Sequence, residues 1–102
     1  MEHKGYLYFM TNSYNTVIYI GVTNSLKRRI CEHSEGRGSK FTAKYYCKKL
    51  VYFESFPTIE QAIAREKLLK RYKRAWKNKM IETINPGWDD LGPTIINDPA
   101  VI

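Results

Sequence analysis

Two short alternating runs near the start of the chain most restrict what it can fold into. Residues 5–10 and 17–21 alternate along GYLYFM and VIYIG, and the TNSYNT between them consists of polar turn formers. Alternation with a period of two is typical of strands. Two such runs on either side of a turn segment predict a β-hairpin with a longer loop.

The alternation also assigns the side chains of this hairpin to two faces. One face is purely apolar and is formed by Leu7, Phe9, Ile18 and Ile20. The opposite face carries Tyr8 and Tyr19. Two interpretations of the tyrosine face stay open: a functional surface, or a solvent-exposed sheet face with tyrosines on it, which is common.

Further elements follow the hairpin. Asn24 and Ser25 are favourable N-caps, so a helix is expected from there to about Glu35. After the glycine-rich EGRGSK, residues 41–49 predict a short helix or an irregular turn. Residues 50–56, LVYFESF, are mostly apolar on both sides, which predicts a third strand in the middle of the sheet.

The longest helix begins after Pro57, where Thr58 and Gln61 form a capping box. It continues, or restarts near Ala75, toward Ile84. Its apolar stripe consists of Ile59, Ala62, Ile63, Leu69 and Trp76. At 102 residues one domain is expected, over residues 1–91, with a flexible C-terminal tail over residues 92–102.

The chain is strongly basic. Its 17 Lys and Arg residues against 10 Asp and Glu residues give a net charge of +7. Such a surplus predicts a polyanionic partner, nucleic acid above all, although an anionic membrane surface also fits the charge alone. Aromatic residues interleave with the cations, as in KRYKRAWK, which suits stacking beside phosphate contacts.

Several features place the chain in a reducing cytoplasm. The start MEHKGYLYFM has no signal-peptide cleavage signature, and no run approaches the roughly 20 apolar residues of a membrane helix. Cys31 and Cys47 are the two cysteines, too few for a disulfide framework. With His33 they lack the paired spacing of a structural zinc site, so zinc is not expected.

Two polar side chains interrupt the face of the first helix that should be apolar. Leu26, Arg29, Ile30 and His33 lie at offsets of three, four and seven residues, so they share one face. Each polar residue has a structural interpretation beside the functional one. Arg29 could pair with a carboxylate at the edge of the core, and His33 could be a packed histidine with satisfied ring nitrogens.

Glu66 is the third unusual residue. It follows Ala62 by four residues and precedes Leu69 by three, in the middle of the apolar stripe of the longest helix. A carboxylate is costly there unless a cation compensates it. Lys70, four residues later, offers an ordinary surface pair as the structural interpretation.

Together these residues suit the hydrolysis of a phosphodiester bond. A carboxylate such as Glu66 can hold a divalent cation that polarises the phosphate. The guanidinium of Arg29 can neutralise the charge that builds on the phosphate in the transition state. A tyrosine or histidine can position or deprotonate the attacking water if neighbouring cations lower its pKa.

The same residues carry a resemblance to a known family. Residues 6–8 (YLY) and 19–21 (YIG) resemble the two halves of the GIY-YIG nuclease signature. Arg29 and His33 match the helix of that motif, and Glu66 matches the metal-binding glutamate of the family. The chain is most similar to small single-domain bacterial members described as predicted endonucleases, which are related to the nuclease module of the UvrC excision-repair protein.

The resemblance covers roughly residues 5–91 and implies an α+β fold with a small three-stranded antiparallel sheet flanked by helices. It implies an endonuclease that uses one Mg²⁺ or Mn²⁺ on Glu66 to cleave DNA (duplex, branched or damaged), with a role in DNA repair or recombination. INPGWDDL, which the small members share, suggests Asn85 as the late polar residue of the family. The candidate contacts to nucleic acid are Lys27, Arg28, Lys40, Lys44 and Asn85.

The resemblance also implies roles for the motif residues. Tyr8 would activate or position the water, Tyr19 would support it, Arg29 would be the electrophilic partner and His33 a second proton handler. How the base role divides between Tyr8, Tyr19 and His33 stays open. Tyr6 stands where the family often has glycine, a departure of little weight because Tyr8 is kept.

Other family members carry a separate DNA-binding domain, so here a homodimer or a protein partner would supply specificity.

Two alternatives to an active nuclease remain. A nucleic-acid-binding module that keeps the fold and has lost turnover would explain the charge and the tyrosines equally well, but it would leave Glu66 unexplained because a carboxylate repels phosphate. A protein-interaction domain would make the basic surplus incidental.

Overall fold

The computed structural model describes residues 4–98 and is built around a three-stranded antiparallel sheet. Its strands are β1 (Gly5–Thr11), β2 (Ile18–Thr23) and β3 (Lys49–Phe56), in the order β2-β1-β3. The expected hairpin of β1 and β2 and the α+β class are confirmed. The central position predicted for β3 is wrong, because β1 pairs with both other strands and β3 lies at an edge.

Five helices accompany the sheet in the described part of the chain. They are α1 (Leu26–Ser34), α2 (Lys40–Lys44), α3 (Ile59–Lys70), α4 (Arg74–Ile84) and α5 (Gly92–Ile96). The caps predicted for the two main helices are present. The Ser25 hydroxyl accepts from the backbone N–H of Arg28, and the Thr58 hydroxyl accepts from that of Gln61. None of these helices is long and apolar enough to cross a membrane.

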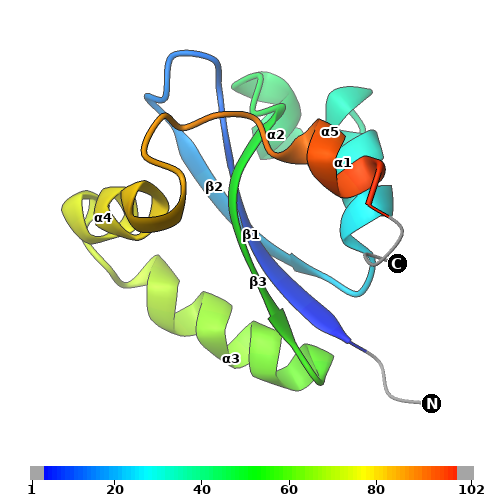
Figure 1. Cartoon of the computed structure of the whole chain (residues 1–102), viewed down its shortest axis with the longest axis vertical. Helices are drawn as coiled ribbons and strands as arrows, with labels where there is room; N and C mark the ends of the chain where they lie inside the picture. Colours follow the sequence, from blue (N-terminus) through cyan, green and yellow to red (C-terminus); the bar gives the residue numbers. More distant parts are fainter. Residues whose placement is uncertain (1–3, 99–102) are drawn as a thin grey trace.

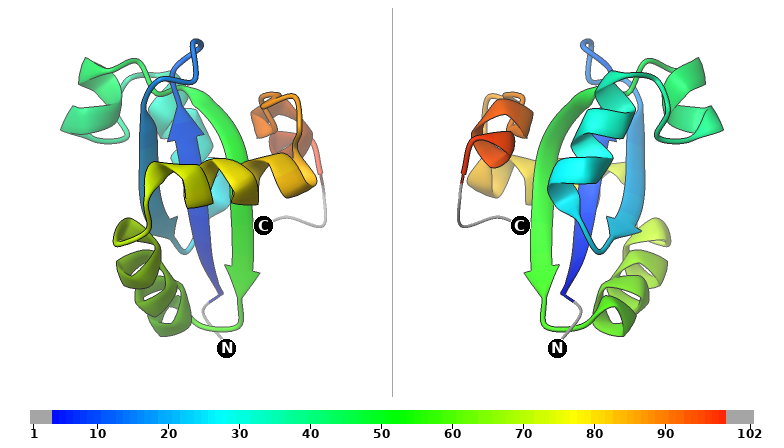
Figure 2. Two further views of the ribbon diagram at one scale, coloured as in Figure 1. Left: turned by 90° about the vertical axis from the view of Figure 1, so that its left-hand side faces the viewer. Right: turned by 90° about the vertical axis from the view of Figure 1, so that its right-hand side faces the viewer.

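Helices cover both faces of the sheet (Figure 1). Figure 2 shows α4 in front of the sheet and α1 behind it in one view, and the reverse in the other. On the α1 and α5 side the core contains Tyr6, Tyr8, Met10, Leu26, Ile30, Leu50 and Ile95. On the α3 and α4 side it contains Leu7, Phe9, Ile20, Val51, Tyr52, Leu69 and Ile81. The two faces expected for the hairpin are confirmed.

The face of the sheet that carries the tyrosines is therefore not a solvent-exposed surface. Tyr8 is only 2% exposed and Tyr6 is buried as well, because α1 packs over them. Tyr19 is half-buried at the edge of the same cluster. The interpretation of these tyrosines as solvent-exposed is therefore wrong for Tyr6 and Tyr8. Strand β1 has an apolar side and an aromatic side, and α1 covers the aromatic side.

The outer edge of β3 is covered by the segment that follows α4. The backbone N–H of Leu91 donates to the carbonyl of Leu50 at 2.7 Å, and the Asp90 carboxylate accepts from the N–H of Leu50 at 3.1 Å. The Asn85 amide donates to the carbonyl of Val51 at 3.0 Å. INPGWDDL thus protects one sheet edge, and β2, which pairs only with β1 among the described residues, forms the other.

Two expectations for the second half of the chain are corrected. Residues 92–96 are not a loose tail: they form α5, which contacts α1 and buries Ile95. Residues 99–102 of that expected tail lie outside the described residues. Trp76 does not extend the apolar stripe, because α3 ends at Lys70 and α4 restarts in a different direction, which leaves Trp76 60% exposed.

Candidate active site

Three of the predicted site residues meet on the α1 side of the sheet. Tyr8 comes from β1, Tyr19 from β2 and His33 from the last turn of α1. The ring centroids of Tyr8 and His33 lie 5.6 Å apart, those of Tyr19 and His33 5.9 Å, and those of Tyr8 and Tyr19 6.2 Å. The strand register and the helix that follows the hairpin bring these rings together.

Gly21 makes room for this cluster. It lies directly opposite Tyr8 in the register of β1 and β2. A Cβ atom at Gly21 would approach the Tyr8 hydroxyl to 2.5 Å, so any larger residue would displace the ring. The ring of Tyr8 therefore crosses Gly21 toward the free edge of β2. The YIG segment needs a glycine at this position because a larger side chain would clash with that ring.

His33 is hydrogen-bonded through both ring nitrogens. Its Nε2 lies 3.1 Å from the Tyr8 hydroxyl, and its Nδ1 lies 3.0 Å from the Thr42 hydroxyl. Because the Thr42 hydroxyl can donate to the carbonyl of Ser39 at 3.2 Å, it is free to accept from Nδ1–H. In that tautomer Nε2 accepts the Tyr8 proton. The packed-histidine interpretation thus holds, and in this tautomer His33 accepts the hydrogen bond from Tyr8.

Burial keeps His33 neutral. Burial, followed by the nearby Arg29 guanidinium, lowers the pKa of His33 from its ordinary 6.5 to about 4, and Glu32 opposes the shift. At neutral pH the ring is therefore an unprotonated base. A buried neutral base beside a phenol is a suitable arrangement for proton transfer.

This lowered pKa predicts how stability changes with pH. Between pH 6.5 and pH 4 the unfolded chain binds a proton at His33 that the native state does not bind, so stability falls as pH falls. Urea unfolding should show that wild type loses about 2 kcal/mol more than His33→Gln between pH 7 and pH 5. Equal pH slopes for the two proteins would mean that His33 titrates normally in the native state.

The pKa of Tyr8 moves in the direction opposite to the one expected from the neighbouring cations. Burial raises it above its ordinary value, the nearby Tyr19 and Glu66 raise it further, and Arg29 lowers it. The expectation that cations would lower the pKa of this tyrosine is wrong for the protein without substrate. Tyr8 is a neutral phenol that can donate its proton to His33.

Arg29 lies beside these groups on α1. It forms an i,i+3 ion pair with Glu32 at 3.5 Å, and its Nη1 donates to the carbonyl of Gly38 at 3.4 Å. The expected carboxylate partner is thus present. The Nε atom, however, is buried and has no acceptor among residues 4–98. Because a buried donor without an acceptor is costly, the hydrogen-bonding capacity of this guanidinium is not fully used within the described residues.

Glu66 comes from α3, which packs on the other face of the sheet. Its side chain is 18% exposed and its carboxylate lies 3.4 Å from the ammonium of Lys70, the surface pair that the spacing allowed. The carboxylate acts electrostatically on Tyr8. No cluster of three His, Cys, Asp or Glu residues that could hold a metal occurs among the described residues. A single carboxylate fits Mg²⁺, which keeps several waters and often binds substrate phosphate.

The candidate contacts to nucleic acid divide into two groups. Arg28, Lys40 and Lys44 are exposed and Lys27 is half-buried, all on α1 and α2 beside the cluster. Asn85 is different: it is 5% exposed, and its amide is used by backbone groups of Val51 and Asp89. Its assignment as a nucleic-acid contact is wrong, because this side chain holds the segment that covers β3.

Two supporting residues escape sequence analysis. Thr42, which is 2% exposed, orients the His33 ring, and Gly38 lies so close to that ring that a Cβ there would approach Nδ1 to 1.9 Å. The glycines of EGRGSK are visible in the sequence as a loop. Nothing in their spacing indicates that the loop folds over the histidine of the preceding helix.

Comparisons with known proteins show the family to which the chain belongs. Residues 4–80 match the model of the GIY-YIG catalytic domain. A UPF0213 protein from Streptococcus pneumoniae is 38% identical over 84 residues, which cover 79% of this chain and 81% of that protein. A UPF0213 protein from Haloquadratum walsbyi is 36% identical over 82 residues, which cover 80% of this chain and 91% of that one.

A solved structure is also similar. The solution NMR structure of a UPF0213 protein from Bacillus halodurans matches with a TM-score of 0.54 and 26% identity, covering 85% of this chain and 92% of that chain. The family model, the sequence relatives and the fold thus agree with the resemblance carried by YLY, YIG, Arg29, His33 and Glu66. The chain belongs to the GIY-YIG domain family and is a relative of its UPF0213 proteins.

Proposed function

We propose that this protein is a divalent-metal-dependent endonuclease that hydrolyses phosphodiester bonds in DNA. The observation that carries the proposal is the meeting of a neutral histidine, a phenol, a guanidinium and a carboxylate at one place. His33 is hydrogen-bonded to Tyr8, and both Arg29 and Glu66 act electrostatically on Tyr8. Membership of a family described as a catalytic domain supports the same activity.

Glu66 would hold the metal ion, Mg²⁺ or Mn²⁺. Its carboxylate is partly buried and its partner Lys70 is 55% exposed, so the ammonium can swing away when a cation and a phosphate arrive. When bound, the ion would polarise the phosphate and stabilise the leaving oxygen. Oxygens of water and substrate would complete the coordination, since residues 4–98 contain no cluster of three His, Cys, Asp or Glu residues that could hold a metal.

Tyr8 and His33 would handle the proton of the attacking water. Tyr8 donates its hydroxyl hydrogen toward Nε2 of His33, which leaves the phenol oxygen with a lone pair to accept from a water. As the water loses its proton to Tyr8, Tyr8 passes its own proton to His33. A hydrogen bond from Nδ1–H to the Thr42 hydroxyl would hold the histidine in the tautomer that this transfer needs.

Arg29 would stabilise the charge that builds on the phosphate. Its guanidinium, on a side chain that is 29% exposed, would donate to a non-bridging phosphate oxygen. Because a donor that is already held in place needs no reorganisation during the reaction, such a contact favours the transition state. Tyr19, whose ring lies beside both Tyr8 and His33, would position the water or the phosphate.

A second candidate function has one observation in its favour. The Glu66–Lys70 ion pair satisfies the carboxylate within α3 and offers it a structural role. A nucleic-acid-binding module with the same fold would keep the basic surface and the aromatic cluster while lacking turnover. DNA that is bound but never cleaved would be the signature of that module.

The test is cleavage of plasmid and of branched DNA by the purified protein with Mg²⁺, with Mn²⁺ and with EDTA. We expect nicking that requires the metal and stops in EDTA. Binding should weaken steeply with salt, because the contacts are to phosphates. Tight binding to every DNA without cleavage in either metal would contradict the nuclease and favour the binding module.

A further inference from the structure

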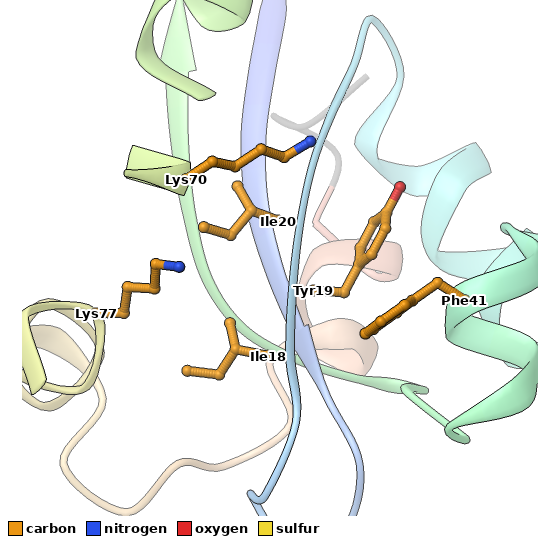
Figure 3. A pocket seen from close by; sticks show the side chains of 6 residues that line it. All are labelled: Ile18, Tyr19, Ile20, Phe41, Lys70 and Lys77. Carbon is orange, nitrogen blue, oxygen red and sulfur yellow. The ribbon is translucent and has the colours of Figure 1, made fainter. Parts of the chain in front are cut away.

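A groove along the free edge of β2 lies next to the candidate active site, and apart from Tyr19 and Lys70 its lining residues have no role in the reaction proposed above. Its volume is about 260 Å³. It is lined by Ile18, Tyr19, Ile20, Phe41, Lys70 and Lys77. Figure 3 shows these side chains on both sides of β2, so the groove extends across the edge of the sheet. We call it the β2-edge groove.

One side of the β2-edge groove is aromatic. Figure 3 places Tyr19 and Phe41 together on this side, and their ring centroids lie 5.8 Å apart. The ring of Phe41 also packs on Tyr45 at 4.7 Å, which holds it in place. Phe41 is 42% exposed although it is a large apolar side chain. A supported, solvent-facing ring is a stacking surface for a flat ligand.

The other side of the groove is cationic. Lys70 and Lys77 lie on this side with Ile18 and Ile20. Lys77 is half-buried and forms no ion pair with a carboxylate among the described residues, and burial lowers its pKa. Residues 67–81 contain seven Lys and Arg residues and no Asp or Glu. A partly buried ammonium without a carboxylate is complemented by an anionic ligand.

The β2-edge groove is continuous with the candidate active site. Tyr19 lines the groove and also packs against Tyr8 and His33. Lys70 lines the groove and pairs with Glu66, the proposed metal ligand. A strand with its scissile phosphate at Glu66 and Arg29 therefore continues directly into the groove.

We propose that the β2-edge groove binds one unpaired nucleotide next to the scissile phosphate, with its base on Phe41 and Tyr19 and its phosphate at Lys70 and Lys77. This inference rests on the proposed function and names its substrate class. A base inside a duplex is stacked on both faces and paired along its edge, so it cannot lie against these rings without leaving the helix. The preferred substrate is therefore DNA with unpaired nucleotides at the cleavage site.

The test compares binding of two DNAs in EDTA by fluorescence anisotropy: a blunt duplex, and the same duplex with a single-stranded extension. The variants are Phe41→Ala and Lys77→Ala. The control for Phe41→Ala is Tyr14→Ala, which removes an 84% exposed ring from the β1–β2 loop. The control for Lys77→Ala is Lys79→Ala, which removes an exposed cation from α4, the helix that also carries Lys77. Thermal unfolding of each variant checks that it is folded.

We expect wild type to prefer the extended duplex. Phe41→Ala should weaken binding to that DNA by roughly 5- to 100-fold, the range for removing one stacking ring, and should leave binding to the blunt duplex nearly unchanged. Lys77→Ala should also reduce the preference and lower the salt slope on the extended duplex by about one. Tyr14→Ala and Lys79→Ala should keep the wild-type ratio of the two affinities.

Three outcomes would overturn this inference. In the first, wild type cleaves DNA but both variants keep the wild-type ratio of affinities, which refutes the groove and leaves the proposed function intact. In the second, wild type binds neither DNA, which refutes the proposed function together with the groove. In the third, wild type sediments as a dimer that Phe41→Ala dissociates, which assigns the β2-edge groove to a second copy of the chain.

Discussion

Glu66→Gln is expected to reduce metal-dependent DNA cleavage on the order of 1000-fold, because it removes the charge that would hold the metal ion. Among residues 4–98 no cluster of three His, Cys, Asp or Glu residues offers a replacement metal site. Binding to DNA should stay the same or become slightly tighter, since one negative charge leaves a phosphate-binding surface. The measurement is single-turnover cleavage across a titration of Mg²⁺ or Mn²⁺.

The fold should tolerate this change. Glutamine has the same shape as glutamate, and an i,i+4 pair with the exposed Lys70 contributes only about 0.5 kcal/mol. Glu60→Gln is the matched control, since Glu60 is exposed on the first turn of the same helix. If Glu66→Gln cleaves like Glu60→Gln, Glu66 holds no catalytic metal. If Glu66→Gln unfolds while Glu60→Gln does not, Glu66 is structural.

Arg29→Ala is expected to lower the rate of cleavage by roughly 10²–10³, with a much smaller effect on DNA affinity. The partly exposed guanidinium of Arg29 would meet a phosphate oxygen whose charge grows in the transition state. The rate of bond cleavage in single turnovers and the dissociation constant in EDTA separate the two effects. Arg29→Lys should recover little, because a single ammonium cannot reproduce the guanidinium geometry.

Arg28→Ala is the contrasting variant. Arg28 is the next residue on α1, but it is exposed and its guanidinium donates to Asn24 at 3.0 Å. It should weaken DNA binding slightly and reduce its salt slope, with the single-turnover rate of bound DNA unchanged. Equal losses of rate and affinity in Arg29→Ala would make Arg29 an ordinary phosphate contact as well.

Local patterns in the sequence predict much of the fold. Alternation along residues 5–10 and 17–21 determines the hairpin and the faces of its side chains, because the two-residue period of a strand is a local property. The caps at Ser25 and Thr58 determine where α1 and α3 begin, since a capping hydroxyl serves N–H groups only a few residues away.

The predictions made from the sequence are wrong where segments far apart in the chain pack against each other. The apolar character of β3 on both sides suggests a central strand, yet β3 is an edge strand whose outer side is covered by Asp90 and Leu91 from far along the chain. Asn85 looks like a free polar side chain until that same segment folds back onto Val51. The break between α3 and α4 turns Trp76 out of the stripe into solvent.

The sequence by itself determined which chemical groups this protein has, and residues 4–80 carry the match to the GIY-YIG catalytic domain. Only the tertiary structure decided the protonation of Tyr8 and His33 and the partners of these side chains. Burial raises the pKa of Tyr8 and lowers that of His33, and Thr42 and Gly38 orient the imidazole ring of His33. Desolvation and hydrogen bonding depend on which segments pack together, and the spacing of residues along the sequence does not show which distant segments will do so.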